Sequence, residues 1–296
     1  MYVTSVEPAA APEPGRARRA RLEFARPDGG YAGWTVVVGH NQAGKTTLLD
    51  EIARSARGER AAHGYAVAWS RAPGPLCLHY RERVPAYEDA AAGPEAAELA
   101  AGDPDAEILL GLDPVQDVRI AAFALELGQA LRRRGADREA AAVVLIDDVE
   151  AHLHPVWQRR IGPWLTRRFP GVQFIVTTHS PYVCQAADPG GLIRLLGPRA
   201  HYAAETVGEE LYHRVVYGSA DDVALSELFG LDSAYSERAE AIRAELVELE
   251  HEIVRGRAGA EEEERHRVLS RLLTSSTSTR ADEIAIRRLR RRREQP

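Results

Sequence analysis

The chain has 296 residues, of which 45% are hydrophobic and 28% are charged, and its formal net charge is −6. This is enough apolar material for one large or two modest globular domains, and the negative charge excludes a protein that is basic throughout. Two cysteines are too few for a disulfide framework, and no apolar run approaches the ~20 residues of a membrane-spanning helix. Because the first residues also lack a signal-peptide pattern, we expect a soluble, cytoplasmic protein with no membrane partner.

The predicted elements alternate between strands and helices along most of the chain. Residues 1–15 are rich in Ala, Pro and Glu, which predicts a disordered leader. The elements expected after it are strands over 19–25 and 34–38, a helix over 45–56, strands over 65–69 and 76–80, a loop or loosely packed helix over 86–104, a helix from 113 to about 134, a strand over 142–146, a helix over 155–168, and strands over 172–177 and 192–196. This alternation predicts an α/β fold with a mostly parallel central sheet flanked by helices.

The C-terminal part, from residue 209, reads as a helical extension. Ile242, Leu246, Leu249 and Ile253 recur at heptad spacing, which fits a helical hairpin that packs on the core or a short coiled-coil surface for a partner. A polar linker follows at 275–279, and an arginine-rich stretch at 287–293 is a solvated end or an arm that contacts nucleic-acid phosphates. The expected organisation is a leader over 1–15, an ATPase core over 16–208, a helical region over 209–274, and a linker with a basic tail over 275–296.

The most specific signal is a phosphate-binding loop. Residues Gly39 to Thr46 fit G-x-x-x-x-G-K-[ST], directly after an apolar strand and before a helix. Backbone N–H groups and the helix N-terminus bind phosphates there, while Lys45, the only lysine of the chain, reaches the β- and γ-phosphates. The Thr46 hydroxyl is a ligand for Mg²⁺. We therefore predict ATP with Mg²⁺ as the ligand, bound by Gly39, His40, Asn41, Gln42, Ala43, Gly44, Lys45, Thr46 and Thr47.

The ends of two later strands supply the remaining chemistry of such a site. Asp147 and Asp148 follow the buried strand over 142–146, where we expect Asp147 to hold Mg²⁺ and Asp148 to polarise the attacking water. His179 ends the next strand, in position to donate a hydrogen bond to the γ-phosphate. Lys45, Asp148 and His179 are thus the predicted catalytic residues. A zinc site made by His152, His154 and His179 is an alternative on residue type, although no fourth ligand is evident.

These segments together resemble the ABC-type ATPases of the RecF, SMC and OLD group, and in particular the stand-alone bacterial AAA-family ATPases of Septu and retron phage-defence systems. The resemblance rests on 39–47, on 147–155, on 174–181, and on 217–222 with 228–232. It implies an ABC-type P-loop fold and a homodimer or heteromer with ATP at the interface, where residues 152–155 form the loop that contacts the partner. A nuclease partner and a nucleic acid bound by the basic tail are further partners to test.

Three features depart from the family pattern. Asp148 stands where the family usually has Glu, so its carboxylate stops roughly 1.5 Å short, and displacements of that order cost about 10²-fold in rate. Glu150 is a residue that could compensate. The signature segment before the long helix is rewritten as residues 111–117, and no glutamine lies between Thr47 and Val115. We therefore expect an ATP-driven dimerisation switch with slow hydrolysis, and the alternative is a non-hydrolysing ATP-sensing subunit or scaffold that needs a partner to complete its site.

Overall fold

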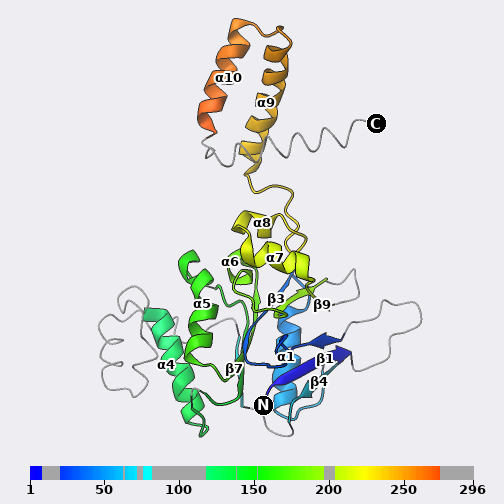
Figure 1. Ribbon diagram of the computed structural model, residues 1–296, viewed down its shortest axis with the longest axis vertical. Helices are drawn as coiled ribbons and strands as arrows, with labels where there is room; N and C mark the ends of the chain where they lie inside the picture. Colours follow the sequence, from blue (N-terminus) through cyan, green and yellow to red (C-terminus); the bar gives the residue numbers. More distant parts are fainter. Residues whose placement is uncertain are drawn as a thin grey trace, which may run out of the picture. The chain divides into compact units, whose positions relative to one another are not determined.

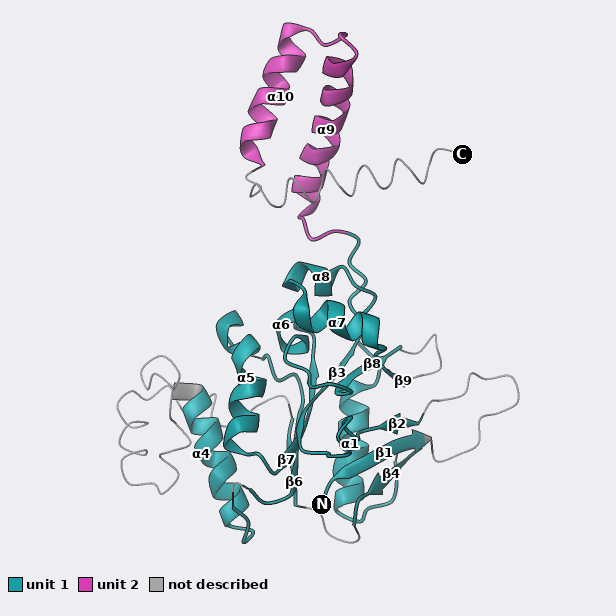
Figure 2. Ribbon diagram, in the orientation of Figure 1, with its two compact units in different colours: residues 1–232 teal, residues 233–296 magenta. Residues whose placement is uncertain are grey.

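The computed structural model describes residues 1–8, 21–62, 64–71, 76–81, 118–137, 139–151, 153–196 and 204–273. The chain divides into two compact units, residues 1–232 and 233–296 (Figure 2). Several predicted features lie outside the described residues: the rest of the leader, the segments 86–104 and 111–117, His152, and the linker and tail from 274 onward.

The larger unit is built on a six-stranded sheet that is parallel except at one edge (Figure 1). In spatial order its strands are β5 (Cys77–Tyr80), β6 (Ala142–Ile146), β7 (Val172–Thr178), β3 (Gly33–Gly39), β8 (Leu192–Leu195) and β9 (Ala204–Thr206). Only β9 runs antiparallel, and it was not predicted. The predicted α/β architecture with a mostly parallel sheet is confirmed, and β3 lies between two strands that come more than a hundred residues later in the chain.

Both faces of this sheet are buried, which explains the unbroken apolar runs of its central strands. Alternate residues point to opposite faces, so Val36 and Ile146 belong to one core while Val37 and Leu145 belong to the other. The first core is covered by α4 (Val118–Arg132) and α5 (Pro155–Arg168). The second is covered by α1 (Lys45–Ala56), through Leu48, Leu49, Ile52 and Ala53, and by a smaller sheet.

The smaller sheet corrects the prediction of a disordered leader. Residues Val3–Pro8 form β1, which pairs antiparallel with β2 (Leu22–Glu23) and β4 (Tyr65–Trp69). Val3 is fully buried, and the Gln173 side chain in β7 both accepts from its N–H at 2.8 Å and donates to its carbonyl at 3.0 Å. The composition of residues 1–15 did not predict this strand, because the residues that stabilise it, in β4 and at Gln173, lie far away in the sequence.

The helices that follow β9 extend the larger unit beyond the expected boundary at residue 208, and they pack against a short helix that precedes β8. The short α6 (Pro181–Cys184), α7 (Glu209–Tyr217) and α8 (Ala220–Ala224) pack together, and Val215 and Val223 are fully buried in the main core. Tyr212 Oη also donates to the Ala187 carbonyl at 3.0 Å. The compact unit therefore ends at Asp232 rather than before α7.

The second unit holds a helical hairpin of α9 (Glu237–Val254) and α10 (Ala260–Leu272). Leu246 and Leu269 are its buried apolar side chains, and Arg265 donates to both carboxylate oxygens of Glu245 at 2.7 and 3.0 Å. The predicted helical C-terminal part is therefore confirmed, and in the described residues it is a hairpin that forms a unit of its own.

None of the helices in the described ranges is long and apolar enough to cross a membrane.

Candidate nucleotide-binding site

The phosphate loop leaves the C-terminal end of β3 and enters α1 through a tight turn. Gln42 and Gly44 adopt positive φ angles of 65° and 95°, and Gly44 stands at the N-cap of α1. Gly44 has no side chain to cap the helix, and none of the described side chains replaces it. The first N–H groups of α1 consequently lack an intrahelical partner and face outward, which is the arrangement that binds an anion. Thr46 is exposed beside them.

Gly39 is required where the loop begins. A Cβ on this residue would lie 2.7 Å from the Leu195 carbonyl oxygen and 3.1 Å from the Ala43 Cβ. β3 and β8 are hydrogen-bonded neighbours at this point, since Gly39 pairs with Leu195. The glycine therefore allows the strand and the loop to approach each other closely.

Lys45 is buried, with 7% of the residue exposed, and its ammonium group has three acceptors in this structure. These are the Gly39 carbonyl at 3.0 Å, the His40 carbonyl at 3.4 Å and the His179 Nε2 atom at 2.7 Å. A protonated ammonium only donates, so the contact is a hydrogen bond to His179 in the tautomer whose Nε2 atom is an acceptor. Burial lowers the pKa of Lys45, and the nearby carboxylates of Asp148, Asp147 and Glu150 oppose that shift.

The loops after β6 and β7 are joined by a hydrogen-bond network through Thr177. The Asp148 N–H donates to Thr177 Oγ1 at 2.8 Å, and the same hydroxyl donates to Asp147 Oδ1. The Val149 N–H donates to the Thr177 carbonyl at 3.1 Å. Asp147 is buried, with 6% exposed, and this contact fixes one of its oxygens. Sequence reasoning missed Thr177, although a Thr-Thr pair at a strand end is a visible signal.

Asp148 has an unusual backbone conformation and an unsatisfied carboxylate oxygen. Its φ of 45° lies in the left-handed region, which Asp and Asn tolerate better than most residues. Its Oδ1 atom is buried and has no hydrogen-bond partner within the part of the chain that the structure describes. A buried carboxylate oxygen without a donor fits a group that binds water or substrate.

The structure brings the predicted catalytic residues together. Lys45 and His179 are in contact, and Asp148 is the first of the carboxylates that act on Lys45 electrostatically. His154 has a different role, because its Nδ1 accepts from the Val156 N–H at 3.3 Å and caps α5. Among the described residues, no group of three or more His, Cys, Asp or Glu side chains is arranged to hold a metal, and His152, a member of the zinc alternative, lies outside them.

The residues present fit ATP and Mg²⁺ by donor chemistry. The uncapped N-terminus of α1 and the Lys45 ammonium are donors for phosphate oxygens, and the exposed Thr46 hydroxyl and the buried Asp147 carboxylate are oxygen ligands of the kind Mg²⁺ prefers. The cysteines add no nucleophile to the site. Burial raises the pKa of the Cys77 thiol to about 12, and it raises the pKa of Cys184 as well.

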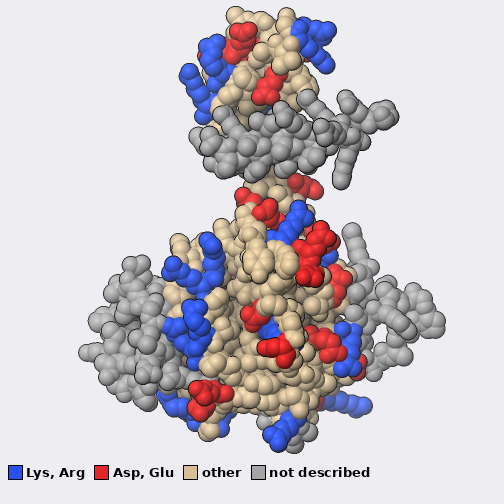
Figure 3. Space-filling model, viewed as in Figure 1, with Lys and Arg blue, Asp and Glu red and all other residues tan. Residues whose placement is uncertain are grey.

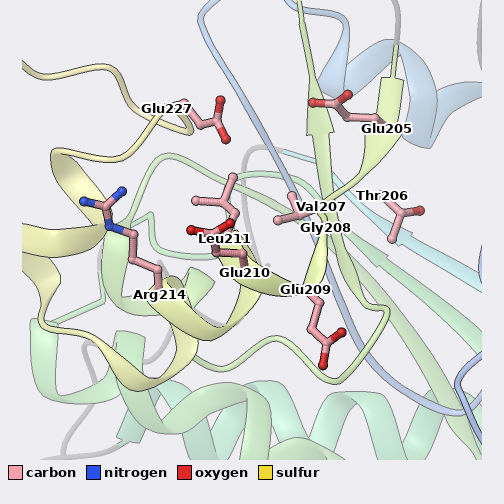
Figure 4. A pocket seen from close by; sticks show the side chains of 9 residues that line it. All are labelled: Glu205, Thr206, Val207, Gly208, Glu209, Glu210, Leu211, Arg214 and Glu227. Carbon is pink, nitrogen blue, oxygen red and sulfur yellow. The ribbon is translucent and has the colours of Figure 1, made fainter.

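A hollow of about 440 Å³ lies where β9 leads into α7 (Figure 4). Its lining includes Glu205, Glu209, Glu210 and Glu227, with Arg214 at one side (Figure 4). The view in Figure 3 likewise shows acidic side chains gathered over the β9 and α7 region, and basic ones over α5. Four carboxylates repel a triphosphate, so this hollow does not compete with the loop as a nucleotide site.

The loop at the end of β3, in a mostly parallel sheet flanked by helices, defines a P-loop NTPase fold. Residues 118–185 match the family model described as "AAA domain, putative AbiEii toxin, Type IV TA system". The predicted resemblance to AAA-family ATPases of retron and Septu systems is confirmed over the matched segments by three curated relatives.

"Retron Ec83 probable ATPase" from Escherichia coli is 52% identical over 50 residues, which are 17% of this chain and 9% of the relative. "Septu protein PtuA" from Bacillus mycoides (strain KBAB4) is 38% identical over 77 residues, 26% of this chain and 11% of the relative. "Retron Vc95 probable ATPase" from Vibrio cholerae is 54% identical over 41 residues, 14% and 8% of the two chains. The matched segments thus cover at most 11% of these three relatives.

Two solved structures overlap the fold more loosely. The SMC head domain from Thermotoga maritima has a TM-score of 0.39 at 16% identity and covers 70% of this chain and 100% of its own. An ATP-binding cassette of an ABC transporter in its ADP conformation has a TM-score of 0.41 at 14% identity and covers 77% and 100%. The fold class follows from the sheet order and the phosphate loop rather than from these overlaps.

Proposed function

We propose that this chain binds ATP with Mg²⁺, hydrolyses it slowly, and uses the nucleotide to close onto a second copy or a related chain. The observation that carries the proposal is the meeting of Lys45 with His179 at 2.7 Å, beside the carboxylates of Asp147 and Asp148. Residues from three separate stretches of the sequence converge there, and each has the chemistry that phosphoryl transfer to water requires.

The roles follow from donors and acceptors. Lys45 and the N–H groups at the start of α1 hold the phosphates, and Thr46 with Asp147 holds Mg²⁺, which when bound supplies positive charge at the β- and γ-phosphate oxygens. The Asp148 carboxylate, with its free buried Oδ1, accepts a proton from the attacking water. The water oxygen forms the new bond to the γ-phosphorus, the bond to the β–γ bridging oxygen breaks, and ADP leaves with that electron pair.

The same geometry supports slow rather than fast turnover. The shorter Asp148 side chain places its carboxylate farther from a γ-phosphate than a glutamate would. This longer distance slows the chemical step without weakening the binding of ATP.

The test is the purified chain with ATP and Mg²⁺, compared with the Lys45→Ala variant. We expect tight ATP binding, phosphate release above the variant, and an increase in mass toward twice the chain mass when ATP is present. No binding difference between the two proteins would refute the nucleotide site itself. An unchanged mass with ATP would refute the dimer switch alone, and including nucleic acid and a candidate nuclease would test the expected partners.

A second candidate function is a subunit that senses ATP without hydrolysing it. The observation in its favour is that the family's usual glutamate is replaced by Asp148 and that neighbouring Glu150 already accepts two hydrogen bonds. This alternative predicts ATP binding at the wild-type level with phosphate release no higher than that of Lys45→Ala. A homodimer that turns ATP over would exclude it.

A further inference from the structure

Glu150 lies two residues beyond Asp148, and its carboxylate spans the gap between the loops that follow β6 and β7. Its Oε2 atom accepts from Thr178 Oγ1 at 2.6 Å, and its Oε1 atom accepts from the His179 backbone N–H. Each carboxylate oxygen therefore has its own donor, and both donors come from the end of β7. Hydrogen bonds to an ionised carboxylate are among the stronger ones in proteins.

The Thr178 hydroxyl fixes the direction of this contact. The Ser180 N–H donates to Thr178 Oγ1 at 2.9 Å, so the oxygen already serves as an acceptor there. Its single proton is then donated to Glu150, and Thr178 is fully buried, so water does not compete for that proton. An amide in place of the carboxylate keeps one acceptor oxygen and puts an N–H₂ donor where the other oxygen now accepts.

The contact sets the position of His179. Glu150 holds its backbone nitrogen, Thr178 holds the N–H of Ser180 that follows it, and the His179 ring then reaches Lys45 Nζ at 2.7 Å. Two consecutive N–H groups on either side of the imidazole are thus anchored to one carboxylate and its partner hydroxyl. In contrast, Asp148 Oδ1 has no such partner within the described residues.

We propose that Glu150 is a positioning residue that places His179 against Lys45 and the γ-phosphate, and that it does not replace Asp148 as the group that activates water. This inference rests on the proposed ATPase function. Glu150 acts through His179, and its carboxylate is committed to Thr178 and the backbone. Its effect is therefore on the rate of the chemical step rather than on the affinity for ATP.

The test uses the full chain with Glu150→Gln, Thr178→Val, the double variant and Thr178→Ser, with Glu205→Gln as a control for loss of an exposed carboxylate. Turnover, ATP affinity and the hydrogen exchange of the 179 and 180 amides are measured for each. We expect Glu150→Gln to lower turnover by about 10- to 100-fold, since small displacements of catalytic groups have effects of that size. ATP affinity should stay within about threefold, as expected when only the chemical step is affected.

The exchange measurement needs no turnover. In the nucleotide-free protein, the 179 and 180 amides should exchange at least about tenfold faster in Glu150→Gln and in Thr178→Val than in wild type, because local opening becomes easier. Thr178→Ser keeps the hydroxyl and should restore both readouts, and the double variant should add little to either single change. Glu205→Gln should match wild type.

Three results would overturn the proposal. Unchanged exchange in Glu150→Gln would show that the carboxylate does not hold the 179 amide. A loss of ATP binding as large as that of Lys45→Ala would make Glu150 part of the binding pocket. Full turnover in Asp148→Asn together with none in Glu150→Gln would make Glu150 the activating base. If wild type binds no ATP, the proposed function fails, and the exchange of the two amides still decides whether Glu150 holds His179.

Discussion

The two halves of the candidate site are held in place by different means. The phosphate loop after β3 depends on its main chain, with positive φ angles at Gln42 and Gly44 and a helix end that no described side chain caps. The ends of β6 and β7 depend on side chains, because the Thr177 and Thr178 hydroxyls join them to Asp147 and Glu150. A loop that binds through its main chain depends on glycines at the positions that need a positive φ angle. A network of side chains depends instead on pairs of residues that lie far apart in the sequence.

The largest effect is expected on ATP affinity when the Lys45 side chain is removed from the phosphate loop. We expect Lys45→Ala to weaken ATP binding by about 100-fold or more in calorimetry, since it removes a charged donor worth about 1.5–3 kcal/mol per hydrogen bond. Lys45→Arg keeps the charge but not the compact ammonium, and it should recover little affinity. Recovery of wild-type affinity with arginine would mean that charge alone, rather than the shape of the loop, holds the phosphates.

The second prediction separates binding from turnover. Asp148→Asn retains a side chain that tolerates the left-handed φ of 45° and leaves the backbone N–H bonded to Thr177. The amide cannot accept a proton, so phosphate release should fall by about 100-fold, at the low end of what a general base contributes. ATP affinity measured in parallel should remain at the wild-type level. A variant that keeps its turnover would remove Asp148 from the proposed chemistry.

The third prediction concerns the stability of the loop half. Gly39→Ala would place a methyl group 2.7 Å from the Leu195 carbonyl oxygen, and we expect a loss of about 1–3 kcal/mol in the free energy of unfolding, typical of overpacking. Gly208→Ala is the matched control, because this glycine has a φ of −64° and no atom within 4 Å of an added Cβ. Urea denaturation of both variants tests this, and equal losses would show that close approach at Gly39 is not the cause.

The smallest effect is expected when the Thr177 hydroxyl, which donates to Asp147, is removed. Thr177→Val removes the donor to Asp147 Oδ1 and the acceptor of the Asp148 N–H while keeping the shape of the side chain. The loss in unfolding free energy should be about 1–2 kcal/mol, and the Mg²⁺ concentration needed for turnover should rise. If Mg²⁺ dependence were unaffected, Asp147 would be oriented without Thr177, and the distinction between the two halves would weaken.

The elements that were predicted correctly are those whose residues form a recognisable local pattern. The bounds of α1, β4, β6 and α5 agree with the prediction because a motif, a strand of alternating exposure, an apolar run and a proline start mark them. β1 was missed because its buried contacts depend on Gln173, 170 residues away. The antiparallel β9 and the inclusion of α7 and α8 in the larger unit likewise depend on packing partners that no local pattern reveals.

The difference between local patterns and long-range contacts also explains which site residues were predicted. Lys45, Asp147, Asp148 and His179 were predicted because each belongs to a recognisable motif, and the structure places the Lys45 and His179 side chains in contact. The roles of Thr177, Thr178 and Glu150 were not found, because a hydroxyl gains its role from the residue that faces it across two loops. Sequence periodicity contains no information about such a pairing.

The position of β3 in the sheet has a consequence for the order in which the molecule is assembled. Among the described strands, β3 pairs with β7 and β8, with Trp34 opposite Phe174 and Val36 opposite Leu192, so these partners are made long after it. Contacts between residues so distant in the chain form slowly, because a large loop must close before they gain any stability. The phosphate loop, encoded near the start of the chain, therefore reaches its working conformation only after β7 and β8 have been synthesised and have docked on either side of β3.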